Sequence, residues 1–141
     1  MSRFEKLIAS DSSFGLQVAA LQVPLRLREH KRAVTHAEKL LAKLNRKSPT
    51  TSQIPHISLP LNVLTSRDPE KIIRDETTNL SSSRRALADF WAGHLRLSKN
   101  DAEGAVSAFE SCANSNVLYT YRYWAECLAI QLSKNKDWPA P

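Results

Sequence analysis

The chain has 141 residues and a formal net charge of +6, and 42% of its residues are hydrophobic and 24% charged. This length and balance predict one soluble globular domain over residues 1–141, with a core of its own. Only three glycines occur, and no two are close together, which excludes a phosphate-binding glycine loop and a dinucleotide fingerprint. No apolar run is long enough for a membrane span.

The N-terminal third predicts three helices. A capping box precedes a short helix over 3–9, and a second helix over 13–23 ends or kinks at Pro24, because proline lacks a backbone donor. Alternating apolar residues leave a strand open as the alternative for 13–23. A third helix over 29–46 follows a short connection, so the second and third helices are expected to pack as a hairpin.

The helix over 29–46 has two opposed faces. At 100° per residue its apolar side chains fall within about 120° of one another, and cations occupy the other side. We define the basic face as Lys31, Arg32, Lys39, Lys43 and Arg46. Residues 26–47 contain eight Lys or Arg and two Glu, a local charge of +6 that equals the charge of the whole chain. Phosphates, an anionic membrane surface or an acidic protein segment would suit this face, and the alternative is a face that only meets solvent.

Residues 48–65 are both proline-rich and apolar. Pro49, Pro55 and Pro60 recur at intervals of five or six residues, so we expect neither a helix nor a central strand to run through. The apolar content is too high for a free linker. Two interpretations are open: an extended strap laid over a helical core, or an exposed docking segment that a partner orders.

Four more helices are predicted after residue 67. Asp68 as a cap and Pro69 in the first position begin a helix over 69–77. The other helices run from the serines at 81–83 to Leu97, over 101–113 and over 117–134, and the tail at 135–141 cannot continue the last one. No segment requires a sheet, so the predicted fold class is all-α.

Two short segments of the sequence recur about 34 residues further along the chain. Residues 90–92, Phe-Trp-Ala, recur as Tyr-Trp-Ala at 123–125, an offset of 33. Residues 97–100, Leu-Ser-Lys-Asn, recur at 132–135, an offset of 35. A period of about 34 residues is typical of helix-turn-helix solenoids.

Residues 86–130 resemble a tetratricopeptide (TPR) repeat followed by the first helix of another. The matching ladder of small and aromatic positions is Gly93, Ala105, Phe109 and Cys112. Small residues let paired helices approach closely, and the aromatic residue wedges between successive hairpins. The chain departs from the family where Asp89 and Arg96 replace an early Trp and Tyr. An irregular helical bundle is the alternative architecture.

The resemblance implies a non-catalytic scaffold that binds a partner peptide or protein on a concave face. The binding residues predicted for this groove are Tyr119, Tyr123 and Arg96. The exposed side of the last helix also allows packing on a second copy of the chain, which would give a homodimer.

No set of residues predicts catalysis, a metal site or a cofactor. The four histidines are widely separated, without an acid placed to orient any of them. Cys112 and Cys127 are expected to be small buried hydrophobic residues rather than a disulfide or metal ligands. We therefore predict a non-enzymatic adaptor or chaperone-like module with an acidic protein partner, located in the cytoplasm or the nucleus. The alternative is an accessory protein that binds nucleic acid through the basic face.

Overall fold

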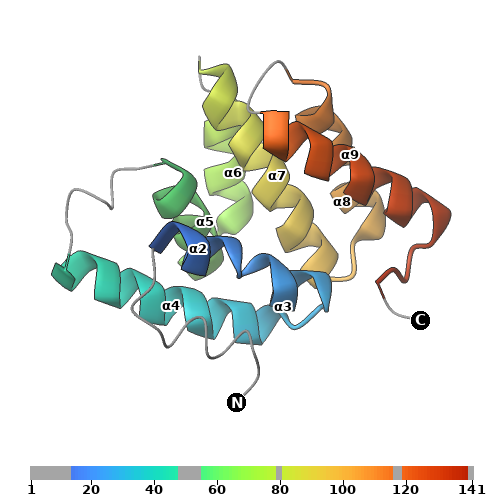
Figure 1. Cartoon of the computed structure of the whole chain (residues 1–141). Coiled ribbons are helices and arrows are strands. Elements are labelled where there is room, and N and C mark those ends of the chain that lie inside the picture. The colour runs from blue at the N-terminus through green and yellow to red at the C-terminus, as the bar shows by residue number, and fades with distance from the viewer. Residues whose placement is uncertain (1–13, 48–54, 79–80, 116–118, 140–141) are drawn as a thin grey trace.

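The computed structural model describes residues 14–47, 55–78, 81–115 and 119–139 (Figure 1). These residues form helices joined by turns and contain no strand, which confirms the all-α prediction. The helices are α2 (Phe14–Ala19), α3 (Gln22–Arg26), α4 (His30–Lys47), α5 (Pro55–Thr65), α6 (Pro69–Thr77), α7 (Ser82–Ser98), α8 (Ala102–Ala113) and α9 (Tyr119–Lys134). The predicted helix over 3–9 lies outside the described residues. No described helix has the length and apolar character needed to cross a membrane.

The segment predicted as one helix over 13–23 is two short helices. α2 ends at Ala19, and α3 begins at Gln22 and continues through Pro24 to Arg26. The strand alternative and the predicted end at Pro24 are therefore wrong. Pro24 is tolerated because it is the third residue of α3, where a backbone N–H has no partner within the helix.

α4 confirms the helix predicted over 29–46. Its apolar stripe is buried, with Ala33, Ala37, Leu40 and Leu44 nearly inaccessible to solvent. α4 contacts α2 and α3, as the predicted hairpin requires, and packs to a similar extent against α5.

The described part of the proline-rich segment is a buried helix, so both the extended strap and the exposed docking segment are wrong for residues 55–65. Pro55 is the first residue of α5, where no N–H bond is lost, and Pro60 removes one interior helical bond. Burial holds the helix in spite of that loss, because apolar side chains on several sides of α5 are inaccessible. They are Ile57, Leu59, Leu61, Val63 and Leu64. Residues 48–54 lie outside the described part.

The helices after residue 67 begin where the caps predict. Asp68 accepts a hydrogen bond from the Lys71 N–H at 3.2 Å, and Asp101 accepts one from the Gly104 N–H at 2.9 Å. α7 lies at the centre and contacts α3, α5, α6, α8 and α9 (Figure 1). One continuous core runs from α2 to α9.

The two cysteines differ in their surroundings. Cys112 is fully buried in the core, as expected, whereas Cys127 is exposed on α9, which corrects its prediction as a buried residue. α9 is the last helix of the described chain and is covered on one side only, so its outward positions meet solvent.

Candidate functional site

The basic face of α4 is only partly free. Lys31 and Lys39 are exposed, while Arg32 and Lys43 are half-buried, and nothing is described of the Arg46 side chain. The Arg32 guanidinium pairs with Glu29 of the preceding turn at 2.9 Å. The face therefore keeps a positive charge, but its freely solvated cations are fewer than the helical wheel indicates.

Arg96, predicted to line a groove, is held in an ion pair. Its Nη2 and Nε donate to the two carboxylate oxygens of Glu70 on α6, at 3.0 and 3.3 Å. The hydrogen bonds to Glu70 raise the pKa of Arg96 above its usual range. Tyr123 is exposed on α9, and the Tyr119 side chain lies outside the described part. Neither Arg96 nor Tyr123 lines either of the two grooves described next.

The more apolar of these grooves lies between α3 and α9. Its volume is about 370 Å³, and we call it the α3–α9 groove. Its lining residues are Gln22, Arg26, Trp124, Cys127, Leu128, Gln131 and Trp138. Trp124 on α9, which lines the groove, is 41% exposed. Two apolar side chains outside the lining are also exposed, Val23 on α3 by 47% and Leu27 directly after α3 by 53%.

A buried histidine supports the wall of the α3–α9 groove. His94 on α7 is inaccessible, its Nδ1 lies 3.1 Å from the Phe90 carbonyl oxygen, and its Nε2 lies 3.4 Å from Arg26 Nε. The carbonyl can only accept and the guanidinium can only donate, so Nδ1 carries the proton and Nε2 accepts. Burial first, and the charge of Arg26 second, lower the pKa of His94 to about 3. The ring is therefore neutral and serves as an acceptor that orients Arg26.

Aromatic rings surround this histidine. The His94 ring packs edge-on against Phe90 and Phe109, with centroids 4.7 and 5.1 Å apart, and Phe90 packs on Tyr121 at 4.9 Å. Edge-to-face contacts of this kind are favourable and fix the relative position of the rings. The cluster joins α7, α8 and the first turns of α9, and so sets the position of Trp124 at the groove.

The chain after α9 returns to α3 and closes one end of the groove. The Arg28 guanidinium donates to the carbonyl oxygens of Lys136 at 2.7 Å and Trp138 at 3.0 Å. Arg28 has φ 61°, the left-handed conformation in which the chain turns from α3 into α4. This anchor holds the Trp138 side chain, which is half-buried, against the groove.

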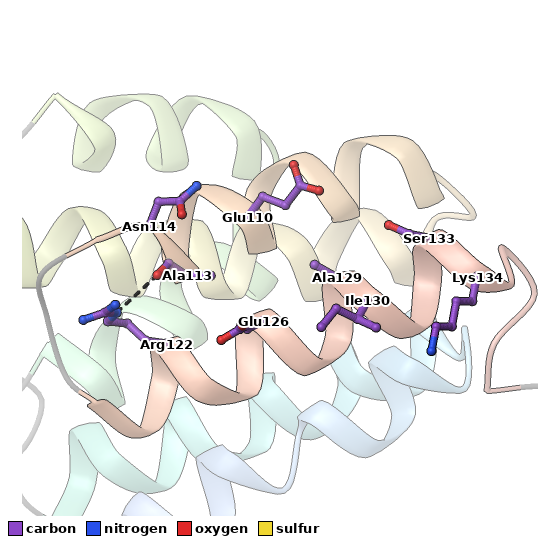
Figure 2. Close-up of a pocket in the computed structure, with 9 residues that line it drawn as sticks. All are labelled: Glu110, Ala113, Asn114, Arg122, Glu126, Ala129, Ile130, Ser133 and Lys134. Atoms are coloured by element: carbon purple, nitrogen blue, oxygen red, sulfur yellow. Dashed lines mark hydrogen bonds between the residues drawn. The ribbon is translucent and has the colours of Figure 1, made fainter.

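A second groove, of about 520 Å³, lies between α8 and α9 (Figure 2). Its wall carries charges of both signs: Glu110 on α8, and Arg122, Glu126 and Lys134 on α9. Arg122 Nε donates to the Ala113 carbonyl oxygen at 3.2 Å and ties the two helices together. Glu126, Ile130 and Lys134 follow one another along the exposed side of α9.

The potential metal ligands among the described residues are scattered, and the Cys112 thiol is buried. No group of three His, Cys, Asp or Glu among them is placed to hold a metal ion. Burial raises the pKa of the Cys112 thiol to about 12, so it stays protonated and is a poor nucleophile. The buried His94 is committed to Phe90 and Arg26 and has no access to a substrate.

Four residues at or beside the groove carry no site prediction from the sequence: Val23, Leu27, Arg28 and Trp138. Val23 and Leu27 lie four residues apart, the spacing of one helical face, but the helix end predicted at Pro24 separates them. Arg28 and Trp138 are 110 residues apart, and no local pattern connects them. Comparisons with the models of known protein families, with curated proteins and with solved structures found no match.

Proposed function

We propose that this chain is a non-enzymatic adaptor or scaffold that binds an apolar segment of a partner protein in the α3–α9 groove. The observation that carries the proposal is the groove itself, which is lined by Trp124, Leu128 and Trp138, with Trp124 41% exposed. Further apolar side chains are exposed on α3 at Val23 and directly after it at Leu27. Clustered exposed apolar groups mark interaction sites, whereas single ones are ordinary. Tryptophan is also enriched among the residues that dominate binding energies.

The partner segment is proposed to carry acidic residues beside its apolar ones. Arg26 lines the groove, and the exposed Lys31 follows five residues later in the first turn of α4. A positive surface beside an apolar groove speeds the approach of an acidic segment and selects against basic ones. The resemblance of residues 86–130 to a TPR repeat points to the same class of function, because it implies a peptide-binding scaffold.

The test is affinity isolation from native extract with the full chain, at two salt concentrations and after nuclease treatment. A captured protein is then purified, and its dissociation constant is measured for the natural chain and for the W124A variant. Removing an apolar contact worth about 1.4 kcal/mol weakens binding about tenfold. Trp124 lines the groove and is 41% exposed, and a thermal unfolding curve of W124A checks that the variant is folded.

Tyr123→Ala is the matched control, because Tyr123 is an exposed aromatic residue on α9 that does not line the groove. The proposal requires that Y123A binds the captured protein as the natural chain does. Equal affinity for the natural chain and W124A would remove the α3–α9 groove as the binding site.

Nucleic-acid binding is the second candidate, and the exposure of Lys31 and Lys39 on α4 favours it. Each phosphate neutralised by a cation releases counterions, so binding to DNA or RNA is expected to fall steeply with salt. Reversing Lys39 and Lys43 to Glu is expected to abolish it. A chain that binds no nucleic acid even at low salt excludes this candidate.

A further inference from the structure

One surface of α9 belongs to neither wall of the α3–α9 groove. It consists of Glu126, Ile130 and Lys134, which we call the α9 ridge (Figure 2). All three are exposed, Ile130 by 45%. Within the described chain, neither Glu126 nor Lys134 takes part in an ion pair. The ridge therefore presents one apolar side chain between two unmatched charges of opposite sign.

The spacing makes this ridge complementary to itself. Glu126 and Lys134 each lie four residues from Ile130, about 6 Å along the axis on either side at 1.5 Å per residue. A twofold axis through Ile130 that sets two copies of α9 antiparallel brings Ile130 against its own copy. The same axis brings each Glu126 opposite Lys134 of the second copy, which gives two symmetric ion pairs.

Other arrangements of the same two helices lose this match. A parallel pair places Glu126 against Glu126 and Lys134 against Lys134, which repel. An antiparallel pair centred between Tyr123 and Ile130 matches those two apolar residues but brings both Glu126 carboxylates together at the axis. Of these three arrangements, the charges favour the antiparallel one centred on Ile130.

We propose that the α9 ridge is the contact surface of a weak homodimer with antiparallel α9 helices centred on Ile130. The occupant of this face is a second copy of the chain. The interface is expected to be weak, since exposed ion pairs contribute little each and the apolar centre is small. The proposal does not depend on the α3–α9 groove and stands if no partner binds there.

The first test is a charge exchange followed by sedimentation over a concentration series. The natural chain is expected to show a mass that rises from monomer to dimer with concentration. E126K and K134E each place like charges together at both ends of the interface and are expected to raise the dissociation constant about tenfold. The double variant E126K/K134E exchanges the signs and is expected to return close to the natural value.

Either of two results would overturn the proposal: a monomeric mass at the highest concentration reached, or a double variant that is no better than the single ones. The double variant separates the pairing from any effect of the charges on folding. All these positions are exposed, so the variants are expected to remain folded.

The second test places a thiol on the axis. In a Cys127→Ser background, Ile130→Cys is expected to form a disulfide-linked dimer under mild oxidation, because residues at the axis meet their own copies. Tyr123→Cys in the same background is the control and lies seven residues from the axis, about 10 Å, so it is not expected to cross-link. The buried Cys112 does not compete. A monomer in which the thiol of I130C reacts freely with reagents would mean that this face is open to a different protein, and it would refute the homodimer.

Discussion

Gly93 on α7 lies directly against the ring of Phe109 on α8, so that a Cβ atom at position 93 would overlap the ring. The two residues are 16 positions apart on the ladder that resembles a TPR repeat. Both are buried, and Phe109 also packs on His94 and Phe90. The close approach of α7 and α8 thus depends on the absence of one side chain.

Gly93→Ala is expected to lower the free energy of unfolding by about 1–3 kcal/mol, because the ring or the helix has to move. Urea unfolding measures the change. Replacing Phe109 by Leu in the same chain is expected to recover part of the loss, and the exposed Ser107→Ala is expected to stay within about 0.5 kcal/mol of the natural chain. A stable G93A would show that the two helices are not packed this closely.

The buried His94 predicts a pH dependence of stability. Its pKa is about 3 in the folded chain and 6.5 as a free side chain, so the unfolded state binds the proton first. The stability linked to the neutral ring is fully present above pH 6.5 and decreases as the pH falls toward 3, by up to about 1.4 kcal/mol per pH unit.

The difference between the natural chain and His94→Gln isolates this effect. Across pH 4–6 the H94Q variant is expected to lose stability less steeply, while Asp89 and His30 titrate alike in both chains. Denaturant midpoints at several pH values provide the measurement. Parallel slopes in the two chains would mean that His94 is accessible to protons in the folded state.

Removing the Arg28 side chain is expected to loosen the tail at residues 136–138. Glycine adopts the left-handed conformation of position 28 readily, so Arg28→Gly keeps the backbone while removing the bonds to Lys136 and Trp138. In R28G, trypsin is expected to cleave after Lys136 several-fold faster than in the natural chain. Mass spectrometry measures the rate. Arg67→Gly, at an exposed position in another connection, is the control. An unchanged cleavage rate in R28G would show that other contacts hold the tail.

The ion pair between Glu70 and Arg96 is expected to contribute modestly to the stability of the fold. A double-mutant cycle with Glu70→Gln and Arg96→Gln is expected to give a coupling of about 0.5–1 kcal/mol in unfolding, because the pair is bidentate but partly exposed. Binding of a captured partner is expected to be unchanged in R96Q. If the cycle shows no coupling and R96Q binds the partner more weakly, Arg96 is a binding residue and not a structural one.

The helices that the sequence predicts best are those with local start signals. Asp68, Ser81 and Asp101 each accept a backbone bond from the first turn of the helix they precede, and this interaction needs no distant residue. The buried stripe of α4 follows in the same way from periodicity alone. The predictions at Pro24 and Pro60 are wrong, because the free-energy cost of a proline depends on its position within the helix and on how deeply the helix is buried.

For this protein, sequence alone determined the helical class, most helix ends and the position of the net positive charge. These properties depend on interactions within a few residues. Only the tertiary structure decided that residues 55–65 are a buried helix, that Arg96 is paired with Glu70, and that Trp138 returns to α3. Each of these depends on burial or on partners far apart in the chain, where the free energy of packing outweighs local preference.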